Sequence, residues 1–161
     1  MYVDKTQHIF DLFQSGSYFF LSRPRRFGKS LLLSTLAEIF KGNQSLFQGL
    51  WIYDQIEWQE RPLIFLDFNS MAFDSLGLEA ALNEALEAQA KLHGITFSSP
   101  SYTSRFKQLI EELGKDRKVA ILIDEYDKPI VNYLQELERA QENQTLLRNF
   151  YSVIKSCDAY I

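Results

Sequence analysis

The sequence predicts an α/β fold, a three-layer sandwich in which helices cover both faces of a parallel sheet. Three apolar runs of strand length lie at residues 18–21, 62–68 and 119–123. The run VAILI at 119–123 does not alternate apolar and polar side chains, as is typical of a strand covered on both faces. Segments with helical spacing of apolar residues separate the runs, and strands that alternate with helices favour a parallel sheet.

Composition and length fit one globular domain, which we expect to fill residues 1–161. Hydrophobic residues make up 46% of the chain and charged residues 24%, which is wrong for a disordered chain. The net charge of −4 disfavours a surface devoted to nucleic acid, and the single Cys157 excludes an internal disulfide or a cysteine-based zinc site. No apolar segment approaches the roughly 18 to 20 residues that cross a bilayer, so we expect a cytoplasmic protein without a membrane partner.

Residues 1–14 are predicted to form the first helix. Asp4 suits the N-cap position, with Gln7 three residues later as in a capping box. Gly16 is expected to end this helix.

A strand, a basic loop and a helix are predicted next. The strand is the apolar run YFFL at 18–21, and the helix spans 29–40 and stops at Gly42. The loop between them carries several arginines, a charge that attracts a polyphosphate.

The loop ends in Gly28, Lys29 and Ser30, as the P-loop pattern G-x-x-x-x-G-K-[ST] requires. In that pattern backbone N–H groups cradle phosphates, the lysine neutralises the β and γ oxygens, and the hydroxyl ligates magnesium. Arg23 stands where the pattern has its first glycine.

The middle of the chain is predicted to alternate packed loop, strand and helices. The expected elements are a packed loop with one short helical turn at 43–61, a strand at 62–68, and amphipathic helices at 74–93 and 99–113. Ser99 suits the N-cap of the last helix, with Pro100 at its first position and Gly114 at its end.

The strand at 119–123 leads directly into Asp124 and Glu125, the Walker B pattern. An aspartate at the carboxyl end of a buried parallel strand lies where α/β folds bind ligands, and in P-loop proteins it holds magnesium. The glutamate after it can polarise the attacking water. Two helices, at 129–139 and 142–156, are expected to complete the chain.

Each motif also has a purely structural interpretation. Gly-Lys-Ser can be a basic turn before a core helix, and Asp-Glu can be a charged strand end. The two motifs occur together on two predicted strands of one chain, and this combination favours a nucleotide-binding protein.

The strings YVDKT at 2–6, SRPRRFGKSLL at 22–32, LDF at 66–68 and LIDEYDKPI at 122–130 resemble the bacterial AAA-ATPase-like family, whose members are often fused to a PD-(D/E)XK nuclease-like domain. The resemblance runs through the whole chain. It implies a magnesium-dependent ATPase with a P-loop, in which an arginine at position 23 is normal. The cofactors implied are ATP and Mg²⁺.

The resemblance assigns a role to each motif residue. Lys29 and Glu125 would be catalytic, and Ser30 and Asp124 would hold the metal. The expected nucleotide contacts are Arg25, Arg26, Phe27, Gly28, Lys29, Ser30 and Leu31. Arg25 and Arg26 could also contact a neighbouring subunit or face solvent.

The family also has a sensor strand and further C-terminal parts for which we find no counterpart here. The sequence therefore predicts an incomplete P-loop sheet with the sensor strand missing, and a chain that resembles an N-terminal fragment of its parent. Two functions stay open: an ATP-hydrolysing module, or a truncated module that binds nucleotide or a partner without hydrolysis. A nuclease-like domain, nucleic acid and an oligomer are partners expected of the parent only.

Four charged residues outside the motifs have two interpretations each. Asp127 and Lys128 are either partners of the Walker B residues or a salt-bridged loop. Asp67 is either a charge at the rim of the site or, as the sequence favours, a cap at the strand end. Asp4 either borders the base of the nucleotide or, again favoured, caps the first helix.

Overall fold

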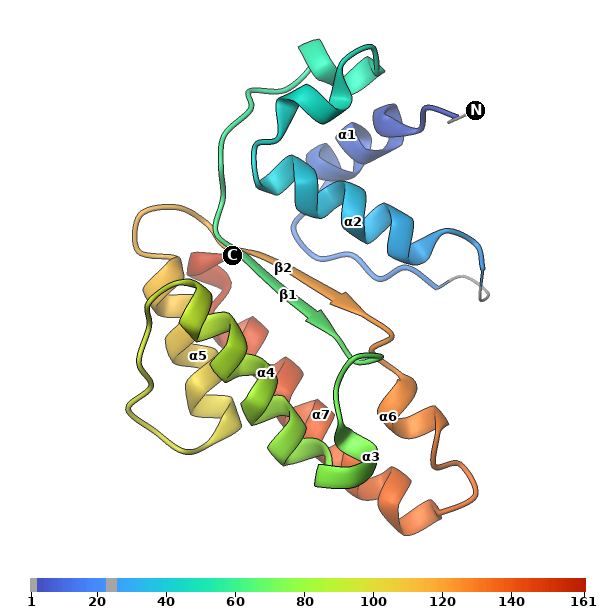
Figure 1. The fold of residues 1–161 in the computed structure, drawn as a ribbon, viewed down its shortest axis with the longest axis vertical. Coiled ribbons are helices and arrows are strands. Elements are labelled where there is room, and N and C mark those ends of the chain that lie inside the picture. The colour runs from blue at the N-terminus through green and yellow to red at the C-terminus, as the bar shows by residue number, and fades with distance from the viewer. Residues whose placement is uncertain (1–2, 23–25) are drawn as a thin grey trace. The chain divides into compact units, whose positions relative to one another are not determined.

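The computed structural model describes residues 3–22 and 26–161 and divides into two compact units, Met1–Leu63 (unit 1) and Ile64–Ile161 (unit 2). The predicted α/β class is confirmed, whereas the three-layer, P-loop-like sheet stays a prediction. The elements in order (Figure 1) are α1 (Thr6–Ser15), α2 (Lys29–Phe40), the 3₁₀ helices η1 (Gln44–Phe47) and η2 (Trp51–Asp54), β1 (Leu63–Asp67), α3 (Phe73–Leu76), α4 (Leu78–Leu92), α5 (Tyr102–Leu113), β2 (Ala120–Asp124), α6 (Lys128–Val131), α7 (Leu137–Ser156) and η3 (Asp158–Tyr160).

In unit 1, α1 packs against α2 and η2 through aromatic side chains. The rings of Phe13 and Phe40 are 5.5 Å apart, and the ring of Phe10 lies edge-on to Trp51 at 5.4 Å. The hydroxyl of Thr6, which is wholly buried, accepts a hydrogen bond from the N–H of Ile52. Unit 1 therefore has a core of its own, although it is a small one.

The predicted capping box at the start of α1 is wrong. The N-cap position belongs to Lys5, and no side chain caps there. Asp4 lies one residue earlier, and its carboxylate accepts the N–H groups of Trp51 at 2.7 Å and Thr6 at 2.9 Å. These hydrogen bonds, that of Trp51 first, lower the pKa of Asp4. Asp4 therefore ties the chain before α1 to η2.

The predicted buried strand at 18–21 is also wrong. The segment forms no strand, and its side chains are 37 to 70% exposed. An apolar run becomes a strand only beside another strand, and the described residues of unit 1 before Leu63 contain none.

The end of α2 is fixed by Gly42, whose φ is +73°. A Cβ at Gly42 would lie 3.2 Å from the backbone nitrogen of Glu60, and the N–H of Arg61 donates to the carbonyl of Phe40 at 2.7 Å. The segment 43–61 is packed as predicted. It has two short 3₁₀ helices where the sequence predicted one helical turn.

Unit 2 contains two parallel neighbouring strands, β1 and β2 (Figure 1), close to the predicted ranges 62–68 and 119–123. The N–H of Phe68 donates to the carbonyl of Asp124 at 3.2 Å, so the carboxyl ends of the strands lie side by side. Ile64 and Leu66 are buried in the helix-lined core, whereas Ile121 is only partly buried against it. The predicted burial of β2 on both faces is thus incomplete.

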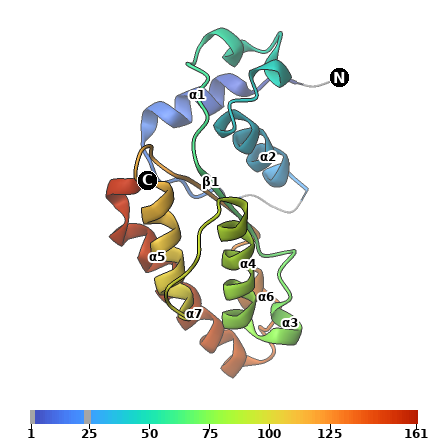
Figure 2. The ribbon, with the colours of Figure 1, turned by 60° about the vertical axis from the view of Figure 1, so that its left-hand side comes forward.

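Helices α4, α5 and α7 lie side by side in Figure 2 and supply most of this core. The rings of Phe106 and Phe150 stack at 4.2 Å, and both side chains are wholly buried. Each helix thus buries one apolar face in unit 2. Among the described residues, no helix has the length and apolar character needed to cross a membrane.

The bounds of several predicted helices differ in the structure. The helix expected at 74–93 is broken at Gly77, whose φ of +82° separates α3 from α4. The helix expected at 129–139 is only the short α6, because the next turn buries Tyr133. Its hydroxyl donates to the carboxylate of Asp74, and the guanidinium of Arg139 lies 3.9 Å from its ring centre. The last helix, α7, begins at Leu137, earlier than the predicted 142.

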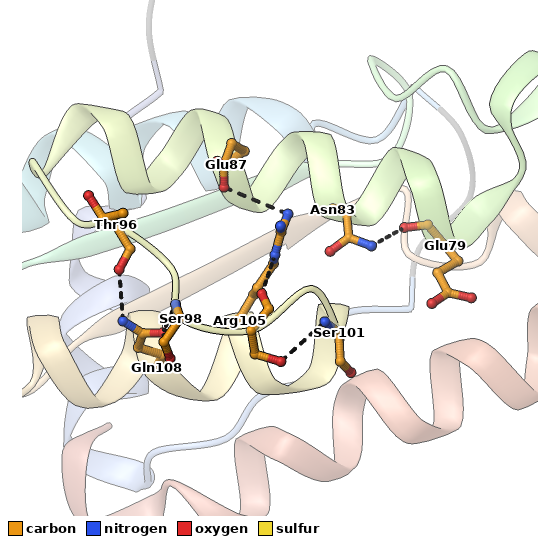
Figure 3. Close-up of polar contacts among 9 residues, drawn as sticks. Glu79, Asn83, Glu87, Thr96, Ser98, Ser101, Arg105 and Gln108 are labelled. Carbon is orange, nitrogen blue, oxygen red and sulfur yellow. Dashed lines mark hydrogen bonds and ion pairs between the residues drawn. The ribbon is translucent and has the colours of Figure 1, made fainter.

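The helix expected from Ser99 begins later, at Tyr102, with Ser101 at the N-cap position. Ser99 belongs to the preceding loop, which Figure 3 shows held by side chains of α5. The Nε of Arg105 donates to the carbonyl of Ser99 at 2.8 Å, and its guanidinium also lies 3.7 Å from the carboxylate of Glu87. Gly114 follows the helix as predicted.

Candidate functional site

The loop before α2 has a left-handed backbone at Arg26, with φ of +67°, and at Gly28, with φ of +75°. Gly28 is the N-cap of α2, and its carbonyl accepts the N–H of Leu32 at 3.0 Å. No side chain caps this N-terminus, and its first turn carries no acidic residue. The first N–H groups of a helix have no partner within the helix, so those of α2 are available to an anion.

Lys29 and Ser30 begin α2. Lys29 is half-buried and Ser30 is exposed, and within the described ranges neither side chain has a hydrogen bond or ion pair. A Cβ at Gly28 would meet no atom within 4 Å, so there is open space at the helix end. The side chains of Phe27 and Leu31 are 63% and 60% exposed. Arg23 and Arg25 lie outside the described residues.

The second half of the candidate site lies at the carboxyl end of β2. Asp124 is the last residue of the strand and is 8% exposed. Its Oδ1 accepts the N–H of Glu125 at 2.9 Å. Glu125 is half-buried and has a φ of +49°, a left-handed conformation that is uncommon outside glycine.

Helix α7 holds the turn that follows Glu125. Asn143, a buried residue of α7, donates from Nδ2 to the carbonyl of Pro129 at 2.7 Å. The hydroxyl of Tyr151 donates to the carbonyl of Tyr126 at 3.5 Å. Burial raises the pKa of Tyr151 well above its ordinary value, so this hydroxyl keeps its proton.

The residues of the two predicted Walker motifs belong to different units. Gly28, Lys29 and Ser30 lie together in unit 1, and Asp124 and Glu125 lie together in unit 2. Their convergence on one crevice stays a prediction. Within the described part of the chain, no group of three or more His, Cys, Asp or Glu side chains is arranged to hold a metal ion.

The residues near Asp124 and Glu125 include one, Asn69, that the sequence did not single out. Asp67 Oδ1 accepts the N–H of Asn69 at 2.8 Å, which confirms the favoured interpretation of Asp67 as a cap at the strand end. Lys128 forms no salt bridge with any of the described residues, so the salt-bridged loop considered for it is not seen. Its Nζ donates to Oδ1 of Asn69 at 2.6 Å. Asn69 had no signal beyond its position directly after the predicted strand at 62–68.

Comparison with protein families places these motifs in a known group. The family model described as "Predicted AAA-ATPase" matches residues 1–161. The chain belongs to this family. An ATPase-like role is therefore supported at the level of the family.

A member of known sequence extends beyond the matched region. The chain is 43% identical, over 164 residues, to an uncharacterized protein in the vnfD 5' region of Azotobacter chroococcum mcd 1. The match covers 99% of the chain and 32% of that relative, so the chain spans about a third of the relative's length. No solved structure matches the chain significantly.

Proposed function

We propose that this chain is the ATP-binding module of a P-loop ATPase that hydrolyses ATP with magnesium. The observation that carries the proposal is the N-terminus of α2. It follows a left-handed Gly28 and has no capping side chain, and Lys29 and Ser30 have no partners among the described residues. These features are what a helix end needs to hold a phosphate group.

In unit 1 the residues of the loop would bind the nucleotide. The first N–H groups of α2 would donate to phosphate oxygens, and Lys29 would neutralise charge on the β- and γ-phosphates. Arg26 would add positive charge beside the phosphates, and the exposed side chains of Phe27 and Leu31 would border the nucleotide. Arg25 is assigned the same role as Arg26 on the family resemblance.

In unit 2 the carboxylates would complete the site. Asp124 is buried and uses Oδ1 to accept the N–H of Glu125, and within the described residues its Oδ2 accepts no hydrogen bond. The Ser30 hydroxyl and this carboxylate are hard oxygen ligands, which fit Mg²⁺. When bound, Mg²⁺ supplies positive charge to the phosphates as negative charge develops there. Glu125 would orient the attacking water and accept its proton.

The experiment compares nucleotide binding with turnover in the full chain. Lys29→Ala is expected to abolish ATP binding, measured by calorimetry. Glu125→Gln is expected to retain binding within about threefold and lower phosphate release by about a hundredfold or more, the scale of lost acid–base catalysis. Lys41→Ala is the matched control, since Lys41 ends the same helix region but pairs with Glu38 at 2.7 Å.

Two outcomes would contradict the proposal. Equal loss of binding in Lys29→Ala and Lys41→Ala would remove the special role of the helix N-terminus. ATP binding without phosphate release in the unmutated chain would favour the other function, a module that binds nucleotide without hydrolysis. The same assays on the longer relative, of which the chain covers 32%, would then show whether further parts are needed for turnover.

A further inference from the structure

The turns after β1 and β2 are connected by one side-chain bond. Lys128 Nζ donates to Asn69 Oδ1 at 2.6 Å, although the two residues are 59 positions apart in sequence. The strand ends are already neighbours, because the N–H of Phe68 donates to the carbonyl of Asp124. The bond between Lys128 and Asn69 therefore adds a second connection beyond the last ladder bond.

Both ends of this bond are fixed to the backbone. The N–H of Asn69 donates to Oδ1 of Asp67 at 2.8 Å, and that of Ser70 donates to the carbonyl of Asp67 at 3.1 Å. The N–H of Lys128 donates to the carbonyl of Glu125 at 3.0 Å. Each partner is thus part of a closed turn.

Glu125 lies inside the turn that Lys128 closes. A left-handed backbone in a residue other than glycine persists only where its surroundings hold it, and such residues concentrate at functional sites. The turn is held by α7 through Asn143 and Tyr151, and by the β1 turn through Lys128.

We propose that the bond between Asn69 and Lys128 positions Glu125, with Lys128 as a positioning residue that never touches the nucleotide. The bond holds the turn, and the turn holds the Glu125 backbone in its left-handed conformation. The consequence for catalysis rests on the proposed function, whereas the effect on the turn does not.

A single exposed ion pair contributes little to a protein, because solvent screens it and two long side chains must be ordered. The bond between Lys128 and Asn69 is exposed as well, but Asn69 is neutral and its backbone N–H is held by Asp67. A hydrogen bond with a charged donor is stronger than one between two neutral groups. The ion pair of Lys115 with Glu112 in the same unit joins residues three positions apart, whereas this bond joins two turns that are 59 positions apart.

The test uses five variants of the full chain, one of them a control. Asn69→Leu and Lys128→Met remove the bond from either side, and their double variant removes both partners. Asn69→Asp keeps an acceptor at the same place. Lys115→Met is the matched control, since it removes an exposed lysine elsewhere in unit 2.

The first readout needs no ATP. Hydrogen exchange of the backbone amides at 124–128 is measured by mass spectrometry in the nucleotide-free chain. Asn69→Leu, Lys128→Met and the double variant are expected to speed exchange in this segment by similar factors. Asn69→Asp and Lys115→Met are expected to leave it unchanged. Unchanged exchange in both bond-removing variants would overturn the proposal.

The second readout is ATP turnover. Asn69→Leu and Lys128→Met are expected to lower kcat roughly tenfold, as a small misplacement of a catalytic group does, with KM for ATP within about twofold. Asn69→Asp should keep kcat within about twofold. Faster exchange with unchanged kcat would show that the bond does not position Glu125. Absence of turnover in the unmutated chain would count against the proposed function, and the exchange data would still decide whether the bond holds the turn.

Discussion

The two halves of the candidate site differ in how firmly their surroundings hold them. At the N-terminus of α2 in unit 1, no side chain of the described residues caps the first N–H groups, and Phe27 and Leu31 are exposed. The carboxyl end of β2 in unit 2 has a buried Asp124, and the turn after it is tied to α7 and to the β1 turn.

This difference matches what each half would have to do. A phosphate-binding helix end needs unsatisfied donors, because the ligand supplies the acceptors. A carboxylate that orients water needs a fixed position before the ligand arrives, because misplacement reduces the rate. The N-terminus of α2 thus leaves N–H groups available to a ligand, whereas the polar groups around the turn after β2 bind one another.

The largest effect expected of this difference concerns packing. Phe106→Ala removes a wholly buried ring that stacks on Phe150 at 4.2 Å, and should lower the free energy of unfolding by about 3 to 5 kcal/mol. Phe27→Ala removes a ring that is 63% exposed and should change the free energy of unfolding by less than about 0.5 kcal/mol. Urea denaturation followed by circular dichroism measures both. Similar losses in the two variants would mean that the loop before α2 is as tightly packed as the core.

A smaller effect is expected at the bond between α7 and α6. Asn143→Ala leaves the carbonyl of Pro129 without its donor and should cost about 1 to 3 kcal/mol. Asn149→Ala is the control, because Asn149 is an exposed asparagine of the same helix and its replacement changes the intrinsic helix propensity equally. The difference between the two variants in thermal or urea unfolding isolates the buried bond. A difference near zero would show that solvent replaces Asn143.

The sequence predicted best those elements that are encoded locally. The apolar runs at 62–68 and 119–123 predicted β1 and β2, because their β-branched and aromatic residues suit a strand and each run has the other as its neighbour. Gly28, Lys29 and Ser30 predicted an open helix N-terminus, because a glycine before a helix leaves its first N–H groups uncapped.

The sequence failed where a partner far along the chain decides the outcome. The run at 18–21 has the composition of a strand, but a strand also needs a neighbour. Asp4 has the right residue type and spacing for a cap, yet it accepts the N–H of Trp51, 47 residues away. Lys128 was noticed for its charge, whereas its acceptor Asn69 is neutral and carries no motif.

The smallest effect is expected on the pH dependence of stability, through the carboxyl of Asp4 in unit 1. Hydrogen bonds from Trp51 and Thr6 lower the pKa of its carboxyl in the folded chain below the usual 3.8. The charged form therefore contributes stability above 3.8, and this contribution is lost as the pH falls through the lower, folded pKa. Asp4→Asn should remove this part of the pH dependence and leave the rest of the curve unchanged.

Tryptophan fluorescence measures this loss, since both tryptophans, Trp51 and Trp58, lie in unit 1 and Trp51 donates its backbone N–H to Asp4. Asp11→Asn is the control, because Asp11 is exposed and makes no hydrogen bond or ion pair among the described residues. Unfolding midpoints of the unmutated chain and of Asp4→Asn should approach each other as the pH is lowered from about 5, while the midpoint of Asp11→Asn follows the unmutated chain throughout. A constant difference across this range would mean that the neutral carboxyl accepts the same hydrogen bonds equally well.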